Sequence, residues 1–238
     1  MDRERLTGSD PGRADTTAVV LAGGMARRLG QDKARATLAG GSMLGQVVRR
    51  LPTAVPIVVV SPDENVLALL ASGDRLASGD REPVDADRPM TRTCEFPPGG
   101  GPVAGLAAGL ELVGTPTMLL LAVDMPLGVH AALTALDELV GSGTGHHASA
   151  VIPVDAGGHR QPLCAAYRTD ALRSALTELV VATGTLRGAS VRSLLARLEV
   201  VELPNLPGAL LLDVDTQVDL VAADLELRSG EWGSTEPG

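Results

Sequence analysis

The chain has 238 residues, of which 45% are hydrophobic, which is enough for one domain with a sizeable core. Its formal net charge of −9 argues against a general nucleic-acid binder, and an aromatic content of 1% leaves little for base stacking. No apolar run approaches transmembrane length and the charged N-terminus lacks a signal-peptide core, so we expect a soluble, cytoplasmic protein without nucleic-acid or membrane partners.

Polar, Gly- and Pro-containing segments stand at both ends of the chain. We expect disordered tails over residues 1–15 and 229–238, with a single domain over 16–228 between them. The first element expected in the domain is a buried parallel strand over 17–22, because this run is almost entirely apolar.

A glycine-rich turn with clustered cations follows this strand. Gly23 and Gly24 let the backbone approach a ligand, and Arg27, Arg28 and Lys33 come within the next nine residues. Backbone N–H groups and cations both favour negative charge, so the segment predicts a polyphosphate site. The spacing matches neither common glycine fingerprint, and an ordinary loop with surface arginines is the alternative.

The lysine in this segment is the only lysine among the 20 basic residues of the chain. A compact ammonium on a flexible stem binds phosphate differently from a planar guanidinium. This distinction favours a phosphate-binding role for Lys33.

The next elements are a helix over 43–51, capped by Ser42, and a buried strand over 56–60. Residues 61–64, with a proline and two acids, are expected to open another helix. The polar segment 72–89 contains a short duplication, and we interpret it as a surface loop without chemistry, with a lid as the alternative.

The middle of the chain contains the most hydrophobic segment. A short strand over 90–95 and a Pro/Gly turn over 97–102 precede a helix over 103–113, whose small residues allow close packing. The strand over 118–123 should be central, and it ends at Asp124.

A carboxylate at the carboxyl end of a central strand lies where ligands bind in open α/β sheets. The alternative is that Asp124 caps the helix expected over 127–140. Pro126 and Gly128 separate it from that helix, so we favour the site interpretation.

The rest of the chain continues the alternation. The expected elements are a strand over 148–155, a polar turn over 157–162 before the segment 163–167, helices over 169–180 and 190–198, an apolar strand over 210–212 and a helix over 217–228.

Strands alternating with helices predict an α/β fold with a mostly parallel sheet covered on both faces. Carboxylates follow two of the expected strands, at Asp124 and at Asp213 and Asp215. If they share an edge with the glycine-rich turn, the site combines cations for phosphates with acids for Mg²⁺. This equipment suits nucleotidyl or phosphoryl transfer.

Five blocks in order resemble the motifs of the molybdenum cofactor guanylyltransferases and their relatives, the MobA-like nucleotidyltransferase family. Together they cover residues 17 to 227. The blocks are L-A-G-G-x-x-x-R-L-G-x-D-K at 21–33, G-P-V-A-G-L at 101–106, D-M-P at 124–126, R-Q-P-L at 160–163 with Tyr167-Arg168, and D-V-D-T at 213–216 with Asp219-Leu220.

The resemblance implies a Rossmann-like three-layer α/β/α sandwich. It also implies transfer of GMP from GTP–Mg²⁺ onto the terminal phosphate of the molybdopterin-type molybdenum cofactor, with release of pyrophosphate. Handover of the product to a molybdoenzyme or a cofactor-synthesis protein would follow.

Site roles are carried over by position. Arg28, Lys33 and Asp124 would be catalytic, and Asp124 with Asp215 would bind Mg²⁺. The residues implied to contact the nucleotide are Leu21, Ala22, Gly23, Gly24, Arg28, Lys33, Glu95 and Asp124.

Departures from the family pattern leave base and acceptor open. Ser61 lies where the family often has Asn, and Glu95 lies roughly where it often has Asp. In the closing motif, Asp213 and Asp215 replace two Asn, and Gln217 replaces Pro. The alternatives are cytidylyl transfer to the same cofactor, transfer to another small phosphorylated metabolite, and a non-catalytic nucleotide-binding partner of a molybdoenzyme.

The cysteines and histidines show no metal-ligand spacing. We expect Cys94 and Cys164 to be reduced thiols, at least one of them buried. His159 is expected in a surface loop, with a place in the acceptor site as the alternative.

Overall fold

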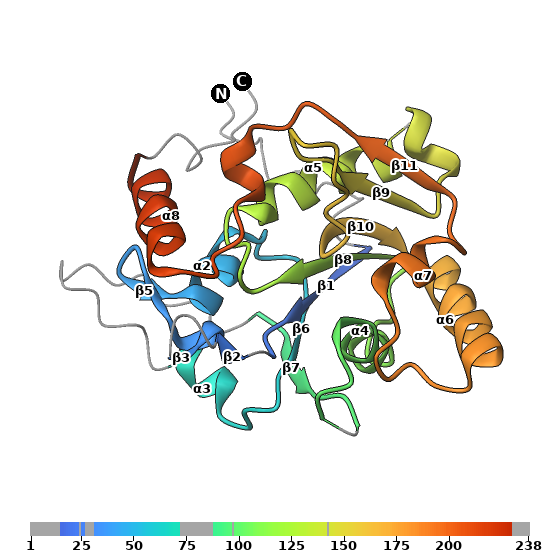
Figure 1. The fold of residues 1–238 in the computed structure, drawn as a ribbon, viewed down its shortest axis with the longest axis horizontal. Helices are drawn as coiled ribbons and strands as arrows, with labels where there is room; N and C mark the ends of the chain where they lie inside the picture. Colours follow the sequence, from blue (N-terminus) through green and yellow to red (C-terminus); the bar gives the residue numbers. More distant parts are fainter. Residues whose placement is uncertain are drawn as a thin grey trace, which may run out of the picture.

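A seven-stranded sheet forms the centre of the computed structural model, in the order β11-β9-β10-β8-β1-β6-β7 (Figure 1). The structure describes residues 15–23, 25–26, 31–71, 88–96, 98–141 and 143–229. The strands of this sheet are β1 (Thr16–Leu21), β6 (Ile57–Val60), β7 (Met90–Thr93), β8 (Thr117–Ala122), β9 (Ala150–Pro153), β10 (Cys164–Arg168) and β11 (Val200–Leu203).

The sheet is mostly parallel, as predicted. Strand β1 lies between β6 and β8 and is parallel to both, with Val19 in register with Val58 and Leu120. Strand β10 is the exception, because it runs antiparallel to β8 and to β9. A hydrogen bond between the hydroxyls of Thr16 and Thr117, 2.7 Å apart, joins the first residues of the two central strands.

Helices cover both faces of the sheet, which confirms the three-layer α/β/α sandwich (Figure 1). One face packs against α2 (Met43–Arg50), α3 (Val66–Ala71), α5 (Gly128–Val140) and α8 (Gln217–Ser229). The other packs against α4 (Pro102–Leu110), α6 (Thr169–Thr183) and α7 (Val191–Leu195). Alternate side chains of β1 supply both cores, because a strand directs successive residues to opposite faces.

Short elements complete the chain around these layers. Two-residue strands pair in hairpins, β2 (Met25–Ala26) with β3 (Gln31–Asp32) and β4 (Thr37–Leu38) with β5 (Gly41–Ser42). The 3₁₀ helices are η1 (Lys33–Arg35), η2 (Thr144–His147) and η3 (Gly208–Leu211). The predicted cap of α2 is confirmed, since Ser42 Oγ accepts the N–H of Gly45 at 3.0 Å.

The strand predicted over 210–212 is wrong. This segment lies in and just after η3, where Leu210 and Leu211 are buried among side chains of the core that includes α5. Pro207 stands at the N-cap of η3, and Gly208 is its first residue. The strand in this region is instead β11, which forms the edge of the sheet beside β9. The charged residue Glu202 interrupts its apolar run, so the sequence did not indicate a strand there.

The segment 72–89 was predicted to be a surface loop, and residues 72–87 lie outside the described part. Arg88 contradicts the prediction, because it is buried. Its guanidinium donates to the carbonyls of Val48 at 2.8 Å and Leu51 at 2.7 Å. These carbonyls belong to the C-terminal end of α2, so Arg88 satisfies acceptors that a helix terminus leaves without partners.

Other expectations differ mainly at the boundaries. The helix expected to open at 61–64 begins at Val66, and the helix expected over 190–198 is reduced to α7. The expected tails fall almost entirely outside the described residues. None of the described helices is long and apolar enough to cross a bilayer.

Candidate active site

Lys33 is held at the start of η1 by local hydrogen bonds. Asp32 caps η1 by accepting the N–H of Ala34 at 3.0 Å, and the N–H of Ala36 donates to the Asp32 carbonyl at 3.1 Å. Ala34 and Ala36 are completely buried, so the backbone on the C-terminal side of Lys33 is packed into the core. The lysine side chain, which is 14% exposed, extends from this fixed base.

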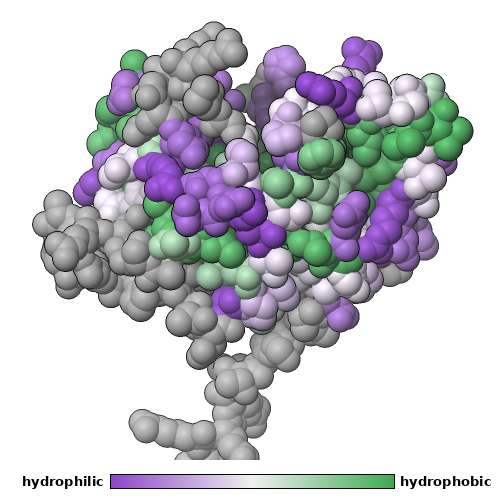
Figure 2. Space-filling view, turned by 90° about the horizontal axis from the view of Figure 1, so that it is seen from below, coloured by the Kyte–Doolittle hydropathy of each residue, from purple (hydrophilic) through white to green (hydrophobic). Residues whose placement is uncertain are grey.

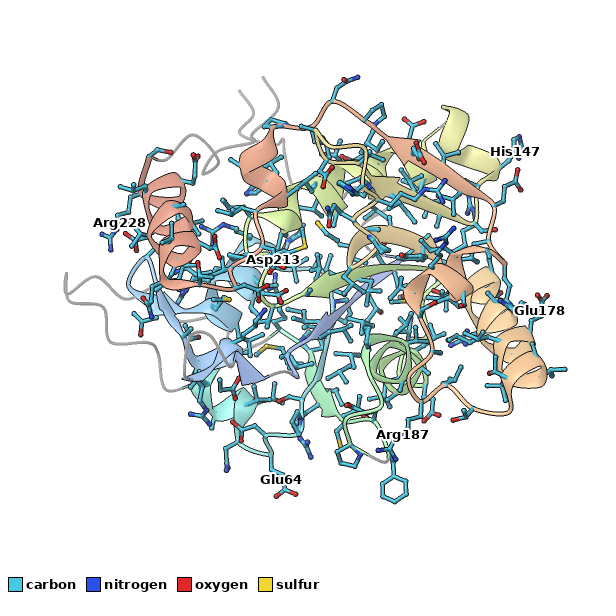
Figure 3. The ribbon with its side chains drawn as sticks, viewed as in Figure 1. Glu64, His147, Glu178, Arg187, Asp213 and Arg228 are labelled. Carbon is cyan, nitrogen blue, oxygen red and sulfur yellow. The ribbon has the colours of Figure 1, made fainter. Side chains whose placement is uncertain are left out.

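The ammonium of Lys33 contacts carboxylates from two distant parts of the chain. Its Nζ donates to Asp124 Oδ2 at 2.6 Å and to Asp215 Oδ1 at 2.5 Å, and it lies 3.9 Å from Asp213 Oδ1. Within the described residues, Asp124, Asp213 and Asp215 each place one carboxylate oxygen within 4.8 Å of the others. Figure 3 labels Asp213 in this cluster, which we call the carboxylate cluster.

A backbone contact brings the cluster together. The N–H of Val214 donates to the carbonyl of Asp124 at 2.9 Å, and the Val214 side chain is completely buried. Asp213 and Asp215 flank this anchored residue. Asp219 holds the following turn, because its Oδ2 accepts the N–H and the hydroxyl of Thr216, both at 2.7 Å.

Asp124 does not act as a helix cap. Among the described residues no side chain caps the N-terminus of α5, and the Asp124 carboxylate instead binds Lys33. This geometry supports the site interpretation of the carboxylate at the end of β8.

The charges of the cluster alter two ionisation equilibria. Burial lowers the pKa of Lys33, but hydrogen bonds to Asp124 and Asp215 outweigh this effect and leave the pKa raised. Burial and the neighbouring charge of Asp124 raise the pKa of Asp213 to about 6. Lys33 is therefore a firmly protonated cation, and Asp213 holds its negative charge less readily than an ordinary carboxyl.

A cavity of about 390 Å³ opens beside the cluster, at the carboxyl ends of the central strands. Gly99 and Gly101 form part of its wall and have φ angles of 77° and 91°, which favour glycine. The lining residues are Leu21, Gly23, Lys33, Val60, Pro62, Glu95, Pro98, Gly99, Gly101, Pro102, Gly105, Ala122, Val123, Asp124 and Leu163.

Most of the predicted site residues that the structure describes meet at this cavity. Leu21, Gly23, Lys33, Glu95 and Asp124 line it. The side chain of Ala22 is buried, and its N–H donates to the Val60 carbonyl at 2.8 Å. Gly24 and Arg28 lie outside the described residues.

Sequence reasoning missed two features of the site. Lys33 was predicted to bind phosphates, and its contact with the carboxylates was not foreseen. Asp213 was recognised at a strand end but was not assigned to the metal. The signal that could have assigned Asp213 to the metal is its position in the sequence. Asp213 and Asp215 flank the buried Val214, and both belong to the carboxylate cluster.

The residues of the cluster fit a magnesium ion. Mg²⁺ prefers hard oxygen ligands and commonly takes one or two carboxylates, with water and phosphate completing its shell. Asp124 and Asp215 can supply these ligands, with Asp213 nearby. A divalent cation would also relieve the repulsion among three converging carboxylates.

A second cavity, of about 430 Å³, is lined by residues of α4 and α6. Val180, Val181 and Leu186 line it together with Arg173, and Val181 is 82% exposed. The apolar surface at the right of Figure 2 lies on the side where α6 stands in Figure 1. This cavity contains none of the predicted site residues.

The layered sheet, with its helices and strand-end site, has the α/β nucleotidyltransferase fold. The sequence model of the family described as MobA-like NTP transferase domain matches residues 18–201. The chain therefore belongs to this family, as its motifs predicted.

Two relatives are named as probable molybdenum cofactor guanylyltransferases. The protein from Bacillus cereus (strain G9842) is 30% identical over 149 residues, which span 63% of this chain and 66% of the relative. The protein from Chloroflexus aggregans is 32% identical over 167 residues, spanning 66% and 67% of the two chains. The alignment thus covers just under two thirds of the Bacillus protein.

Solved structures share the fold. Molybdopterin-guanine dinucleotide biosynthesis protein A from Archaeoglobus fulgidus matches with a TM-score of 0.61 at 22% identity, covering 90% of this chain and 99% of that one. The 4-diphosphocytidyl-2C-methyl-D-erythritol synthase from Anaerococcus prevotii matches with a TM-score of 0.62 at 11% identity, covering 90% and 98%. At these identities the likeness concerns the fold alone.

Proposed function

We propose that this chain is an enzyme that transfers GMP from GTP–Mg²⁺ to the terminal phosphate of the molybdopterin-type molybdenum cofactor and releases pyrophosphate. The observation that carries the proposal is the position of Lys33 and Asp124, a cation and a carboxylate on the wall of one cavity at the ends of the central strands. Membership of the family and the names of the two relatives support the same activity.

The charged residues would act on the phosphates. In the proposed reaction, a phosphate oxygen of the acceptor attacks the α-phosphorus of GTP, and the bond to the leaving pyrophosphate breaks. Lys33 would donate to non-bridging phosphate oxygens and offset the charge that builds on them. Arg28, by resemblance, would assist it.

Asp124 and Asp215 would hold Mg²⁺ beside the same phosphates. When bound, the ion supplies electrostatic stabilisation and aligns the reacting oxygens. The backbone of Leu21, Ala22 and Gly23 would approach the nucleotide closely, since the glycine adds no side chain at the wall of the cavity.

Glu95 supports guanine as the base. Its carboxylate lies on the cavity wall, and Oε1 accepts the N–H of Gly99 at 3.1 Å, which restrains its position. A carboxylate accepts hydrogen bonds from two adjacent donors, and the N1–H and the exocyclic amine of guanine are such a pair. Cytosine and adenine do not present two neighbouring donors on this edge.

A nucleotide panel tests the proposal. Thermal unfolding is followed with GTP, CTP, ATP and UTP, each with and without Mg²⁺. A nucleotide at about 100 times its dissociation constant adds roughly 2.7 kcal/mol to the free energy of unfolding. We expect GTP with Mg²⁺ to give the largest shift. A larger shift with CTP would favour cytidylyl transfer, and equal shifts with all four would remove the guanylyl assignment.

Turnover separates an enzyme from a non-catalytic binding partner. Pyrophosphate release that requires both GTP–Mg²⁺ and the molybdopterin-type cofactor is the expected result. Nucleotide binding without such release would favour a non-catalytic partner of a molybdoenzyme. The proposal includes handover of the product to a molybdoenzyme or a cofactor-synthesis protein. It also places the protein in the reducing cytoplasm, because its two cysteines are not bridged.

A further inference from the structure

The ammonium of Lys33 occupies the position at which a divalent cation would bind the carboxylate cluster. It lies 2.6 Å from Asp124 Oδ2 and 2.5 Å from Asp215 Oδ1. We propose that Lys33 competes with Mg²⁺ for these carboxylates, so that the metal binds tightly only after nucleotide phosphates have drawn the ammonium away. This inference rests on the proposed function, because it assigns the order in which that site fills.

The two cations compete for the same carboxylates and repel each other there. A protonated lysine has three N–H donors and no lone pair, so it cannot itself be a metal ligand. Mg²⁺ requires its oxygens at about 2.1 Å in a nearly octahedral shell. Lys33 takes up one oxygen of each of two carboxylates and lies 3.9 Å from the third, Asp213. A metal ion entering this space meets the positive charge of the ammonium, and binding is favoured once that charge has moved away.

The side chain of Lys33 can move while its backbone stays. The capping bond from Ala34 to Asp32 and the buried Ala36 hold the main chain of η1. The four-carbon stem has rotatable bonds throughout, and the side chain already lines the cavity where phosphates would lie. Rotation about these bonds transfers the ammonium from carboxylates to phosphates without any change in the fold.

The exchange couples two binding events. Phosphates that attract Lys33 expose the carboxylates, and a metal that takes the carboxylates directs Lys33 toward phosphate. Each ligand then raises the affinity for the other by the same factor, since coupling between binding sites is reciprocal. The free protein should therefore hold Mg²⁺ weakly, although three carboxylates converge.

Binding of Mn²⁺, as a spectroscopic substitute for Mg²⁺, tests the competition without nucleotide or turnover. Free Mn²⁺ is measured by electron paramagnetic resonance during titration of the full chain and of Lys33→Met. We expect the variant to bind Mn²⁺ about tenfold or more tightly than the original protein. Equal affinity in the two proteins would overturn the inference. If the ion binds in this cluster, the double variant Lys33→Met/Asp124→Asn should lose the gain in Mn²⁺ affinity that Lys33→Met shows.

Arg35→Met is the matched control, because it removes one positive charge from the same short helix. Arg35 pairs with Asp63, with Nη2 2.5 Å from Oδ2, and Asp63 is not a member of the carboxylate cluster. It should leave the Mn²⁺ affinity unchanged. A tenfold gain in Arg35→Met as well would reduce the effect to overall charge and would contradict the proposal.

A second measurement uses the unaltered protein and does not depend on the folding of a variant. Lysine labelled with ¹⁵N at Nζ gives one side-chain signal, since Lys33 is the only lysine. We expect Mg²⁺ alone, at saturating concentration, to shift that signal. An unchanged signal while Mg²⁺ binds the cluster would contradict displacement. Because neither test contains nucleotide, the inference can fail while the nucleotide panel succeeds, and the reverse.

Discussion

A methyl group placed on Gly109 would lie 2.5 Å from Cγ1 of Val19, so α4 rests directly on the central strand at this point. One turn earlier, a Cβ on Gly105 would lie 3.4 Å from Cδ2 of Leu21, which is an ordinary contact. The two glycines therefore differ in purpose. Gly109 allows close packing, and Gly105 lines the cavity.

We expect Gly109→Ala to lower the free energy of unfolding by roughly 1 to 3 kcal/mol, because overpacking displaces β1 or α4. Gly105→Ala should change stability little, since alanine also favours a helix, but should weaken nucleotide binding. Urea unfolding and nucleotide titration of both variants check this pair. Similar stabilities for the two variants would contradict the packing argument.

Asp124→Asn removes the charge that would hold Mg²⁺ while keeping size and polarity. We expect loss of turnover with little loss of stability, because the carboxylate stands at the rim of the core. Asp215→Asn should be milder, since the motif that this segment resembles has Asn at this position. Pyrophosphate release and thermal unfolding are measured together. Near-normal release by Asp124→Asn would place the metal elsewhere.

Lys33→Arg keeps the positive charge, but we expect the variant to lack the activity of the original protein. The planar guanidinium is larger than an ammonium and cannot occupy the same point between Asp124 and Asp215. In the original protein, saturating GTP–Mg²⁺ should protect Lys33 from acylation more than CTP–Mg²⁺ does, as followed by peptide mass spectrometry. Normal turnover of Lys33→Arg would make the lysine incidental.

The raised pKa of Asp213 predicts a pH-dependent stability. A carboxyl with a folded pKa of about 6 and an unfolded value of about 3.9 favours the fold when protonated. The contribution of Asp213 to the free energy of unfolding is full below about pH 4 and is lost as the pH rises through about 6. Asp213→Asn, in metal-free buffer, should therefore be more stable than the original at about pH 7.5 and equal at about pH 4. The same difference at both pH values would count against this cause.

The two cysteines should react differently with alkylating reagents. Cys164 is completely buried, and burial raises its pKa to about 12, so it forms almost no reactive thiolate at neutral pH. Cys94 is exposed. We expect one modified thiol in the native protein and two after denaturation, counted by mass spectrometry. Rapid modification of Cys164 in the native protein would indicate local opening around β10.

Local sequence was sufficient for the parts of the site that follow strands. The apolar run before Asp124 predicted the central strand β8, and the carboxylate that follows it lines the cavity. The Ser42 cap was predictable for the same reason, since capping depends on neighbouring residues. Lys33 could be singled out from the composition, because it is the only lysine in the sequence.

Features that depend on distant contacts were not predictable. The direction of β10 is set by its pairing with β8 and β9, which its own residues do not reveal. Arg88 has a structural purpose only because carbonyls at the end of α2 face it. The carboxylates around Lys33 depend on the Val214 anchor, and η3 on its packing against α5.

The sequence separations within the site have a consequence for synthesis on the ribosome. Lys33 binds Asp124, 91 residues later, and Asp215, 182 residues later. Because the chain emerges from its N-terminus, β1 can pair with β6 early but must wait for β8, since Thr16 is in register with Thr117. The nascent chain therefore carries its lysine long before the carboxylates arrive. The charged centre closes only when the segment around Val214 has left the exit tunnel.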